Sequence, residues 1–193
     1  MRIAGHRLPG AVEATAVGAI TALDEQTMKL HPWIYTLGPM STTDIKAMKT
    51  RSIFRTQCTV SAEIQAPPDK VWTILTKADD MVRWNSTLTS IEGDIELGGI
   101  VRMQVPEAPG RTFKINVTRF VPNKEMVWRQ GNPVMFLGVR TYSLAPNPDG
   151  TATRFQMTEV FSGLLLPAIA GRLPDFGPIF EQYAADLKAE SEK

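Results

Sequence analysis

Two charged residues fall within otherwise apolar rows of predicted strands, and they are best placed in this sequence to do chemistry. Residues 151–161 alternate between apolar and polar side chains, and Glu159 occupies an apolar position of that strand. Arg140 falls in the inward-facing row of the strand predicted at 135–144. The short loop at 146–150 joins the two strands, which places Arg140 opposite, or diagonal to, Glu159. Because a buried charge is costly unless paired, we expect an ion pair.

The predicted pair permits two interpretations. In the first, it is a structural ion pair, either buried or at the mouth of a cavity in contact with water. In the second, it orients a polar group on an otherwise apolar ligand. Arg140 would then bind a carboxylate, phenolate or carbonyl oxygen, and Glu159 would accept a hydroxyl proton or act as a base. Tyr142 packs in the core in one interpretation and donates its hydroxyl to the ligand in the other.

The elements that position these residues are indicated by hydrophobic periodicity and by turn residues. A strand at 58–64 precedes two short helices, one at 70–76 with Asp69 as its N-cap and one at 79–84. Turns rich in Gly, Pro and Asn separate six further strands. These strands are predicted at 88–95, 100–105, 112–120, 125–130, 135–144 and 151–161.

A longer helix closes the chain, because apolar side chains recur there at three- and four-residue spacing. They are Phe176, Ile179, Phe180, Tyr183 and Leu187. One strand, two helices, six strands and a long helix predict an α+β fold with an antiparallel sheet. Residues 164–174 contain two prolines and a glycine before this helix, and they form either a flexible lid or a buried connector.

Composition and missing motifs exclude several classes of protein. The 193 residues carry a formal net charge of +1 and no basic stripe interleaved with aromatics, so we expect no nucleic-acid partner. Cys58 is the one cysteine, which excludes an intramolecular disulfide and predicts a reducing, cytoplasmic location. No apolar run reaches the roughly 20 residues of a membrane span, so we expect no stable membrane insertion. We find no zinc-ligand cluster, phosphate loop or dinucleotide fingerprint, and expect neither metal nor cofactor.

The first 47 residues differ from the rest and contain both histidines, His6 and His31. We interpret residues 1–47 as an extension that is poorly ordered or follows a misassigned start, although residues 11–28 could form a helix and a weak targeting signal is an alternative. The main domain is predicted at 48–193 and holds no histidine.

Five stretches of the main domain carry a family resemblance. They are A-P-P-D-K-V-W-T-I-L-T at 66–76, W-N at 84–85, S-I-E-G-D-I-E-L-G-G at 90–99, F-V-P-N-K-E-M-V-W at 120–128 and T-R-F-Q-M-T-E-V-F-S-G-L-L at 153–165. Together they resemble the START-like (SRPBCC) superfamily, and more narrowly its polyketide cyclase/dehydrase and lipid-transport group, related to the plant Bet v 1 allergens. The resemblance implies a helix-grip fold, in which a seven-stranded antiparallel sheet wraps the C-terminal helix and leaves a cavity for an apolar ligand.

The inward side of each predicted strand, the last helix and the end of the second short helix would line this cavity. The expected ligand-binding residues are Trp84, Met103, Phe113, Ile115, Trp128, Phe136, Arg140, Tyr142, Met157, Glu159, Phe180 and Tyr183. The bound compound would be a lipid or an aromatic or polyketide-like molecule. One alternative is a cyclase- or dehydratase-type enzyme that uses Glu159 and Arg140 as candidate catalytic residues, and another is a domain that stimulates chaperones. The absence of histidine from the main domain favours binding, and the oligomeric state is not indicated.

These interpretations predict different results for Glu159→Gln. If the pair orients a ligand, the substitution lowers ligand affinity or turnover more than it lowers thermal stability. Ligand titration and thermal unfolding of the same preparation measure the two effects, and an equal loss of both would support a structural ion pair.

Overall fold

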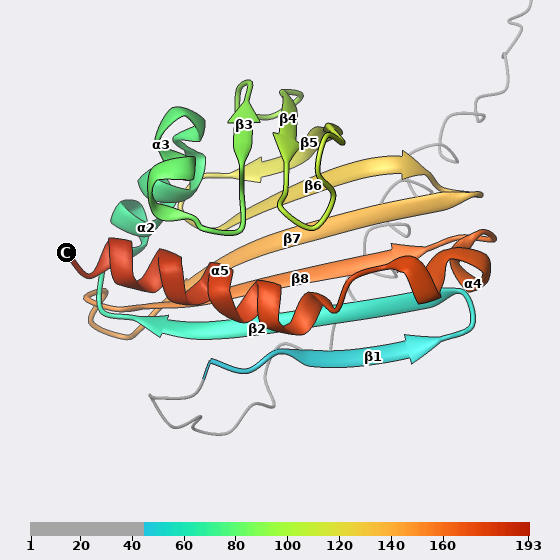
Figure 1. Ribbon diagram of the computed structural model, residues 1–193. Coiled ribbons are helices and arrows are strands. Elements are labelled where there is room, and N and C mark those ends of the chain that lie inside the picture. The colour runs from blue at the N-terminus through green and yellow to red at the C-terminus, as the bar shows by residue number, and fades with distance from the viewer. Residues whose placement is uncertain (1–44) are drawn as a thin grey trace, which may run out of the picture. The chain divides into compact units, whose positions relative to one another are not determined.

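An antiparallel sheet curves around the C-terminal helix α5 (Phe176–Ser191) in the computed structural model (Figure 1). The structure describes residues 45–193, which belong to one compact unit. The interpretations of residues 1–44, including the helix at 11–28 and both histidines, lie outside the described residues. Within the described part the sheet has eight strands in the order β1-β2-β8-β7-β6-β5-β4-β3.

The remaining elements follow in chain order. The strands are β1 (Met48–Ser52), β2 (Arg55–Ile64), β3 (Ser90–Glu92), β4 (Ile100–Gln104), β5 (Phe113–Val121), β6 (Glu125–Asn132), β7 (Phe136–Pro146) and β8 (Thr153–Ser162). The helices are α2 (Pro68–Thr76), α3 (Ala78–Trp84), α4 (Leu166–Ile169) and the 3-10 turn η2 (Ala170–Arg172). The α+β helix-grip architecture is thus confirmed, with short helices after the first long strand and a long helix at the end.

Three predicted details are wrong. The sheet has eight described strands instead of seven, because β1 pairs with β2 as an added edge strand. All five β1 residues are exposed and mostly polar, so no apolar alternation announces the strand. Asp69 is not the N-cap of α2, since the helix begins one residue before it and Pro67 occupies that position. The strand predicted at 88–95 shortens to the three residues of β3.

Helix α5 covers the concave face of the sheet through its apolar stripe. Asp175 caps the helix by accepting a hydrogen bond from the Gly177 backbone N–H at 3.0 Å. Phe180, Tyr183 and Leu187 are buried against the inward-facing side chains of the strands. Six of the predicted lining residues on the strands are buried, namely Met103, Ile115, Trp128, Tyr142, Met157 and Glu159, whereas Phe113, Phe136 and Arg140 are half-buried.

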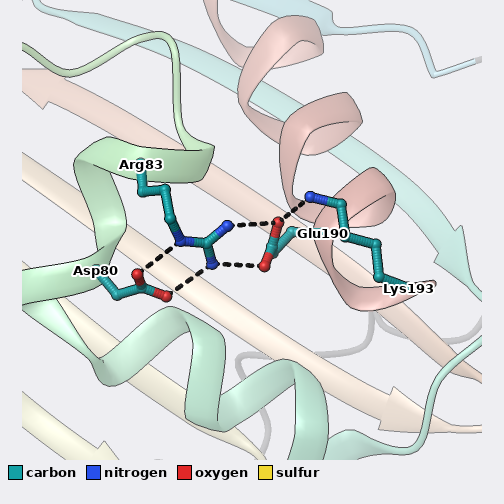
Figure 2. Close-up of polar contacts among 4 residues, drawn as sticks. All are labelled: Asp80, Arg83, Glu190 and Lys193. Atoms are coloured by element: carbon teal, nitrogen blue, oxygen red, sulfur yellow. Dashed lines mark hydrogen bonds and ion pairs between the residues drawn. The ribbon is translucent and has the colours of Figure 1, made fainter.

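A four-residue ionic network joins α3 to the C-terminal end of α5 (Figure 2). Arg83 donates to both carboxylate oxygens of Asp80, at 2.7 and 2.8 Å. The same guanidinium donates to both oxygens of Glu190, at 2.5 and 3.2 Å. Lys193 Nζ adds a third donor to Glu190 at 2.6 Å. Because Trp84 follows Arg83 directly, the network helps to hold that indole against α5.

The network predicts an acid-sensitive contribution to stability. Hydrogen bonds from Arg83 and Lys193 lower the pKa of the Glu190 carboxyl from 4.5 to about 2. A carboxyl whose pKa is lower in the folded state stabilises the fold above its unfolded pKa, and this stabilisation is lost as the pH falls through the folded value. We therefore expect Glu190→Gln to lower the melting temperature by a few degrees near neutral pH.

The difference in melting temperature between this variant and the wild type should shrink between pH 4.5 and about 2, as thermal unfolding across that range measures. Glu96→Gln, at an exposed carboxylate of the β3–β4 turn, is the matched control and should behave as the wild type does. A difference for Glu190→Gln that stays constant down to low pH would contradict the role of this network.

Candidate functional site

A row of side chains crosses the concave face beneath the middle of α5. The strand register places Cys58 of β2 opposite Glu159 of β8, and Glu159 opposite Arg140 of β7. On the other side, Arg140 lies opposite Trp128 of β6. The predicted juxtaposition of Arg140 and Glu159 is therefore confirmed as a directly opposed cross-strand pair.

Arg140 and Glu159 form a buried ion pair. Arg140 Nη2 and Nε donate to the same oxygen, Glu159 Oε2, at 2.6 and 3.1 Å. The two side chains are only 16% and 6% exposed, so each charge depends on the other for compensation. Burial lowers the pKa of the Arg140 guanidinium, but the interactions with Glu159 and Tyr142 together raise it more, and the net pKa lies above the ordinary value. The guanidinium also lies over the ring of Phe180 from α5, 5.1 Å from its centroid.

Four aromatic side chains with polar atoms form a series of ring contacts that begins beside this pair. The rings of Trp128 and Tyr142 meet edge to face at 5.1 Å, and the Tyr142 ring lies 6.0 Å from that of Tyr183 on α5. Trp84, at the end of α3, meets Tyr183 edge to face at 5.8 Å. Ser86 donates to Asp186 of α5 from its backbone N–H at 2.8 Å and from its hydroxyl at 2.7 Å, which fixes the approach of α3 to the helix.

The polar atoms of these four rings have no hydrogen-bond partner among residues 45–193. They are Trp84 Nε1, Trp128 Nε1, Tyr142 Oη and Tyr183 Oη, and all four side chains are buried. Arg140 and Tyr183 lie near enough to the Tyr142 hydroxyl to act against the rise in its pKa, but without the geometry of an ordinary hydrogen bond. Burial raises the pKa of both tyrosines, so both hydroxyls remain protonated donors at neutral pH.

Such a concentration of unpaired donors is energetically unfavourable in a protein interior. Each buried donor left without a hydrogen bond costs about 1–3 kcal/mol. Native structures keep few such groups, and those that remain call for a partner. Two indole N–H groups and two hydroxyls thus lie unpaired in the same part of the interior as the Arg140 guanidinium, and all of these groups are hydrogen-bond donors.

The structure divides the twelve predicted site residues into two groups. Eight of them are linked by ring contacts, the ion pair or strand register around Arg140, and these are Trp84, Trp128, Arg140, Tyr142, Met157, Glu159, Phe180 and Tyr183. Met103, Phe113 and Ile115 lie on β4 and β5, beyond β6, and the half-buried Phe113 stacks under Arg111. Phe136 begins β7, four residues before Arg140, and stacks on Phe161 at 5.6 Å, so it has no direct contact with the Arg140 row.

A pocket of about 300 Å³ between β1, β2 and the start of α5 was missed by the sequence reasoning. Lys49, Cys58, Leu173 and Phe176 are among its lining residues, and Lys49 pairs across it with Asp175 at 2.6 Å. Burial raises the pKa of the Cys58 thiol to about 11, so at neutral pH it is protonated and unsuited to act as a nucleophile. The pocket depends on β1, and the polar β1 residues carry no strand pattern that could have predicted it.

Two further kinds of feature are absent from the described residues. No group of three or more His, Cys, Asp and Glu side chains in residues 45–193 is arranged to hold a metal ion. No helix in that part of the chain is long and apolar enough to cross a membrane.

The sheet wrapped around α5, with its short helices after β2, defines a START-like helix-grip domain of the SRPBCC class. Residues 55–192 match the family described as polyketide cyclase / dehydrase and lipid transport, and the chain belongs to that family. Comparison with curated proteins finds no sequence match.

Solved structures support the same fold. The chain is similar to truncated norcoclaurine synthase from Thalictrum flavum, with 14% identity and a TM-score of 0.56 over 76% of this chain and 99% of that one. A START superfamily protein from Mycobacterium smegmatis gives 17% identity and a TM-score of 0.52, over 70% and 97% of the two chains. A conserved protein of unknown function from Enterococcus faecalis gives 16% identity and a TM-score of 0.55, over 76% of this chain and 77% of that one.

The buried pair predicts strongly non-additive substitutions. Arg140→Met leaves the Glu159 carboxylate buried without a counter-charge, and should lower the free energy of unfolding by about 3–5 kcal/mol. Arg140→Met combined with Glu159→Leu removes both charges and should recover most of that loss. Chemical denaturation of the single and double variants measures both quantities.

The exposed pair between Arg154 and Glu63, on adjacent positions of β8 and β2, is the matched control. Replacing its members by Met and Leu should change stability by no more than about 1 kcal/mol. A similarly small effect of Arg140→Met would show that water compensates Glu159.

Proposed function

We propose that the protein binds a hydrophobic small molecule between the concave face of the sheet and α5, and that an oxygen of this molecule meets the donors around Arg140. The observation that carries the proposal is the set of four buried ring donors that no group in residues 45–193 satisfies. Family membership supports it, since the family is described as polyketide cyclase / dehydrase and lipid transport.

The chemistry of the site defines the class of ligand. Apolar and aromatic side chains dominate the interior, which selects a lipid or an aromatic or polyketide-like body. Arg140, Tyr142 and Trp128 would receive a carboxylate, phenolate or carbonyl oxygen. Glu159 Oε1 takes no part in the hydrogen bonds with Arg140, and would accept a hydrogen bond from a hydroxyl of the same ligand.

A cyclase- or dehydratase-type activity is the second candidate, and the placement of Glu159 favours it. A carbonyl held by Arg140 and Tyr142 would become more acidic at the adjacent carbon, because these donors stabilise the negative oxygen that forms when the proton leaves. Glu159, on the neighbouring strand, would take that proton as a general base. Incubation of the bound compound with the protein, followed by analysis of the compound, separates an enzyme from a carrier.

Native mass spectrometry of the purified full chain tests binding directly. The proposal predicts a discrete adduct that disappears on denaturation and whose mass identifies the compound. If the protein carries no adduct, anilinonaphthalene sulfonate serves as a probe, because it combines apolar rings with anionic oxygens and fluoresces when transferred from water.

Removal of single donors should separate binding from stability. Tyr142→Phe and Trp128→Phe each delete one unpaired donor and keep an aromatic ring, so we expect each to weaken binding of the probe by about 3- to 10-fold. Thermal stability should stay equal or rise for Tyr142→Phe, because an unsatisfied buried group is removed and the ring is kept. Trp128→Phe also makes a buried side chain smaller, so it should lower stability about as much as Trp72→Phe does. Tyr142→Phe discriminates better than Glu159→Gln, which leaves the buried Arg140 charge without compensation and so lowers stability as well.

Trp72→Phe is the matched control for the indole. Trp72 lies on α2 and packs edge to face on Phe120 at 5.0 Å, away from the Arg140 row. Its replacement should lower stability and leave probe affinity unchanged. If Tyr142→Phe and Trp128→Phe affect affinity no more than Trp72→Phe does, the proposed ligand position is wrong.

A further inference from the structure

Three segments that are distant in sequence meet at the end of the sheet where α4 lies (Figure 1). They are the β1–β2 turn, the β6–β7 turn and the residues that follow β8. Backbone hydrogen bonds join them, since Gly163 N–H donates to Phe54 C=O at 3.3 Å and Leu164 N–H donates to Val134 C=O at 3.0 Å. The three segments therefore present one shared surface, although each is a short turn.

This surface is apolar at its tips. Each segment contributes two large hydrophobic side chains, and the six are between 41% and 73% exposed. They are Ile53, Phe54, Val134, Met135, Leu164 and Leu165, which we call the turn cluster. Isolated exposed hydrophobic residues are common on soluble proteins, but a contiguous group of them indicates an interaction site.

The charges around the turn cluster have one sign. Arg51 and Arg55 flank the β1–β2 turn, and Arg172 follows α4 in η2, and all three are exposed. The three segments, taken as residues 51–56, 132–137 and 162–174, contain these arginines and no Asp or Glu. The carboxylate that follows them in sequence, Asp175, is already paired with Lys49.

We propose that the turn cluster docks the protein on the surface of an anionic lipid membrane. Aliphatic side chains at turn tips insert between headgroups without a spanning segment, and flanking arginines meet lipid phosphates. A protein partner fits less well. Specific protein interfaces bury about 800 Å² on each side and centre on clustered aromatic anchors, whereas the turn cluster has the single aromatic Phe54.

Docking at this end would bring the bilayer next to the pocket at β1. Arg51 flanks the turn cluster and also lines the pocket, together with Leu173 and Phe176. The Phe176 ring lies 5.8 Å from that of Phe180, and Phe180 lies under Arg140. An apolar ligand leaving the membrane would thus meet a continuous aromatic path toward the donors around Arg140, a consequence that rests on the proposed function.

Co-sedimentation of the full chain with lipid vesicles tests the docking. We expect binding to vesicles of phosphatidylcholine mixed with phosphatidylglycerol, little binding to phosphatidylcholine alone, and a decrease as salt is added. Ile53→Asp combined with Leu164→Asp should lower partitioning by at least about 10-fold, because charged tips no longer enter the interface. Arg51→Gln and Arg172→Gln should each lower it by about 5-fold.

Matched controls lie toward the other edge of the sheet. Leu97→Asp places a charge on an equally exposed hydrophobic residue of the β3–β4 turn, and Lys114→Gln removes an exposed cation from β5. Both should partition as the wild type does.

Absence of vesicle binding, or equal losses for control and turn-cluster variants, would overturn the proposal. So would a solution dimer that dissociates when Ile53 and Leu164 are replaced by Asp, since the turn cluster would then be covered by a second copy.

Probe binding in the absence of vesicles keeps the two proposals separate. The variant that combines Ile53→Asp with Leu164→Asp should bind anilinonaphthalene sulfonate as the wild type does, because neither residue belongs to the proposed ligand site. Loss of vesicle binding with normal probe affinity would thus be the expected signature of a docking defect. Vesicle binding by a protein that takes up no probe would leave docking intact and refute the proposed ligand site.

Discussion

The packing of α5 against the concave face of the sheet holds this domain together and encloses its polar groups. Strands β2, β8 and β7 each turn large apolar side chains toward the helix, among them Val60, Phe155 and Met157. Without α5 these side chains would face water, and their burial is the main source of stability of such a layer. The ionic network around Arg83 and the α3 contacts hold the C-terminal half of the helix over this face.

Burial beneath α5 also sets the chemistry of the polar groups on that face. In water the charges of Arg140 and Glu159 would interact weakly, but enclosed by aromatic rings they need each other and gain strength as hydrogen-bonding groups. The same enclosure leaves the indole and hydroxyl donors without access to solvent. A ligand oxygen that satisfied them would offset a cost already present in the folded protein, which is how preorganised sites achieve affinity.

Periodicity predicted most of the fold because each strand and helix buries one face. The alternation in residues 151–161, together with the loop length before it, was sufficient to place Glu159 against Arg140. Strand β1 could not be predicted in this way, since it is an exposed edge strand held by its backbone pairing with β2. Charged residues such as Lys49 are typical of edge strands, but they do not distinguish a strand from a loop.

The candidate site was predictable in composition but not in detail. The inward faces of the strands, the apolar stripe of the last helix and the family resemblance selected twelve residues, and the structure brings eight of them together. Periodicity assigns a face of the sheet and not a position along it. Met103 shares the face of Arg140 but lies on β4, three strands away. Phe136 lies on the same strand and face as Arg140, but at the start of β7, where it packs on Phe161. Unpaired donors and the turn cluster depend on side-chain geometry and on turns that meet in space, which no local pattern records.

Nuclear magnetic resonance can show whether a ligand reaches the unpaired indole N–H groups beneath α5. With the protein labelled with nitrogen-15, we expect anilinonaphthalene sulfonate to shift the Trp84 and Trp128 indole signals and to slow their exchange with water, because both N–H groups gain an acceptor. Trp72, which packs on Phe120, serves as the internal reference and should not change. Probe binding that leaves the Trp84 and Trp128 signals unaltered would show that the ligand lies elsewhere and that the unpaired donors do not bind it.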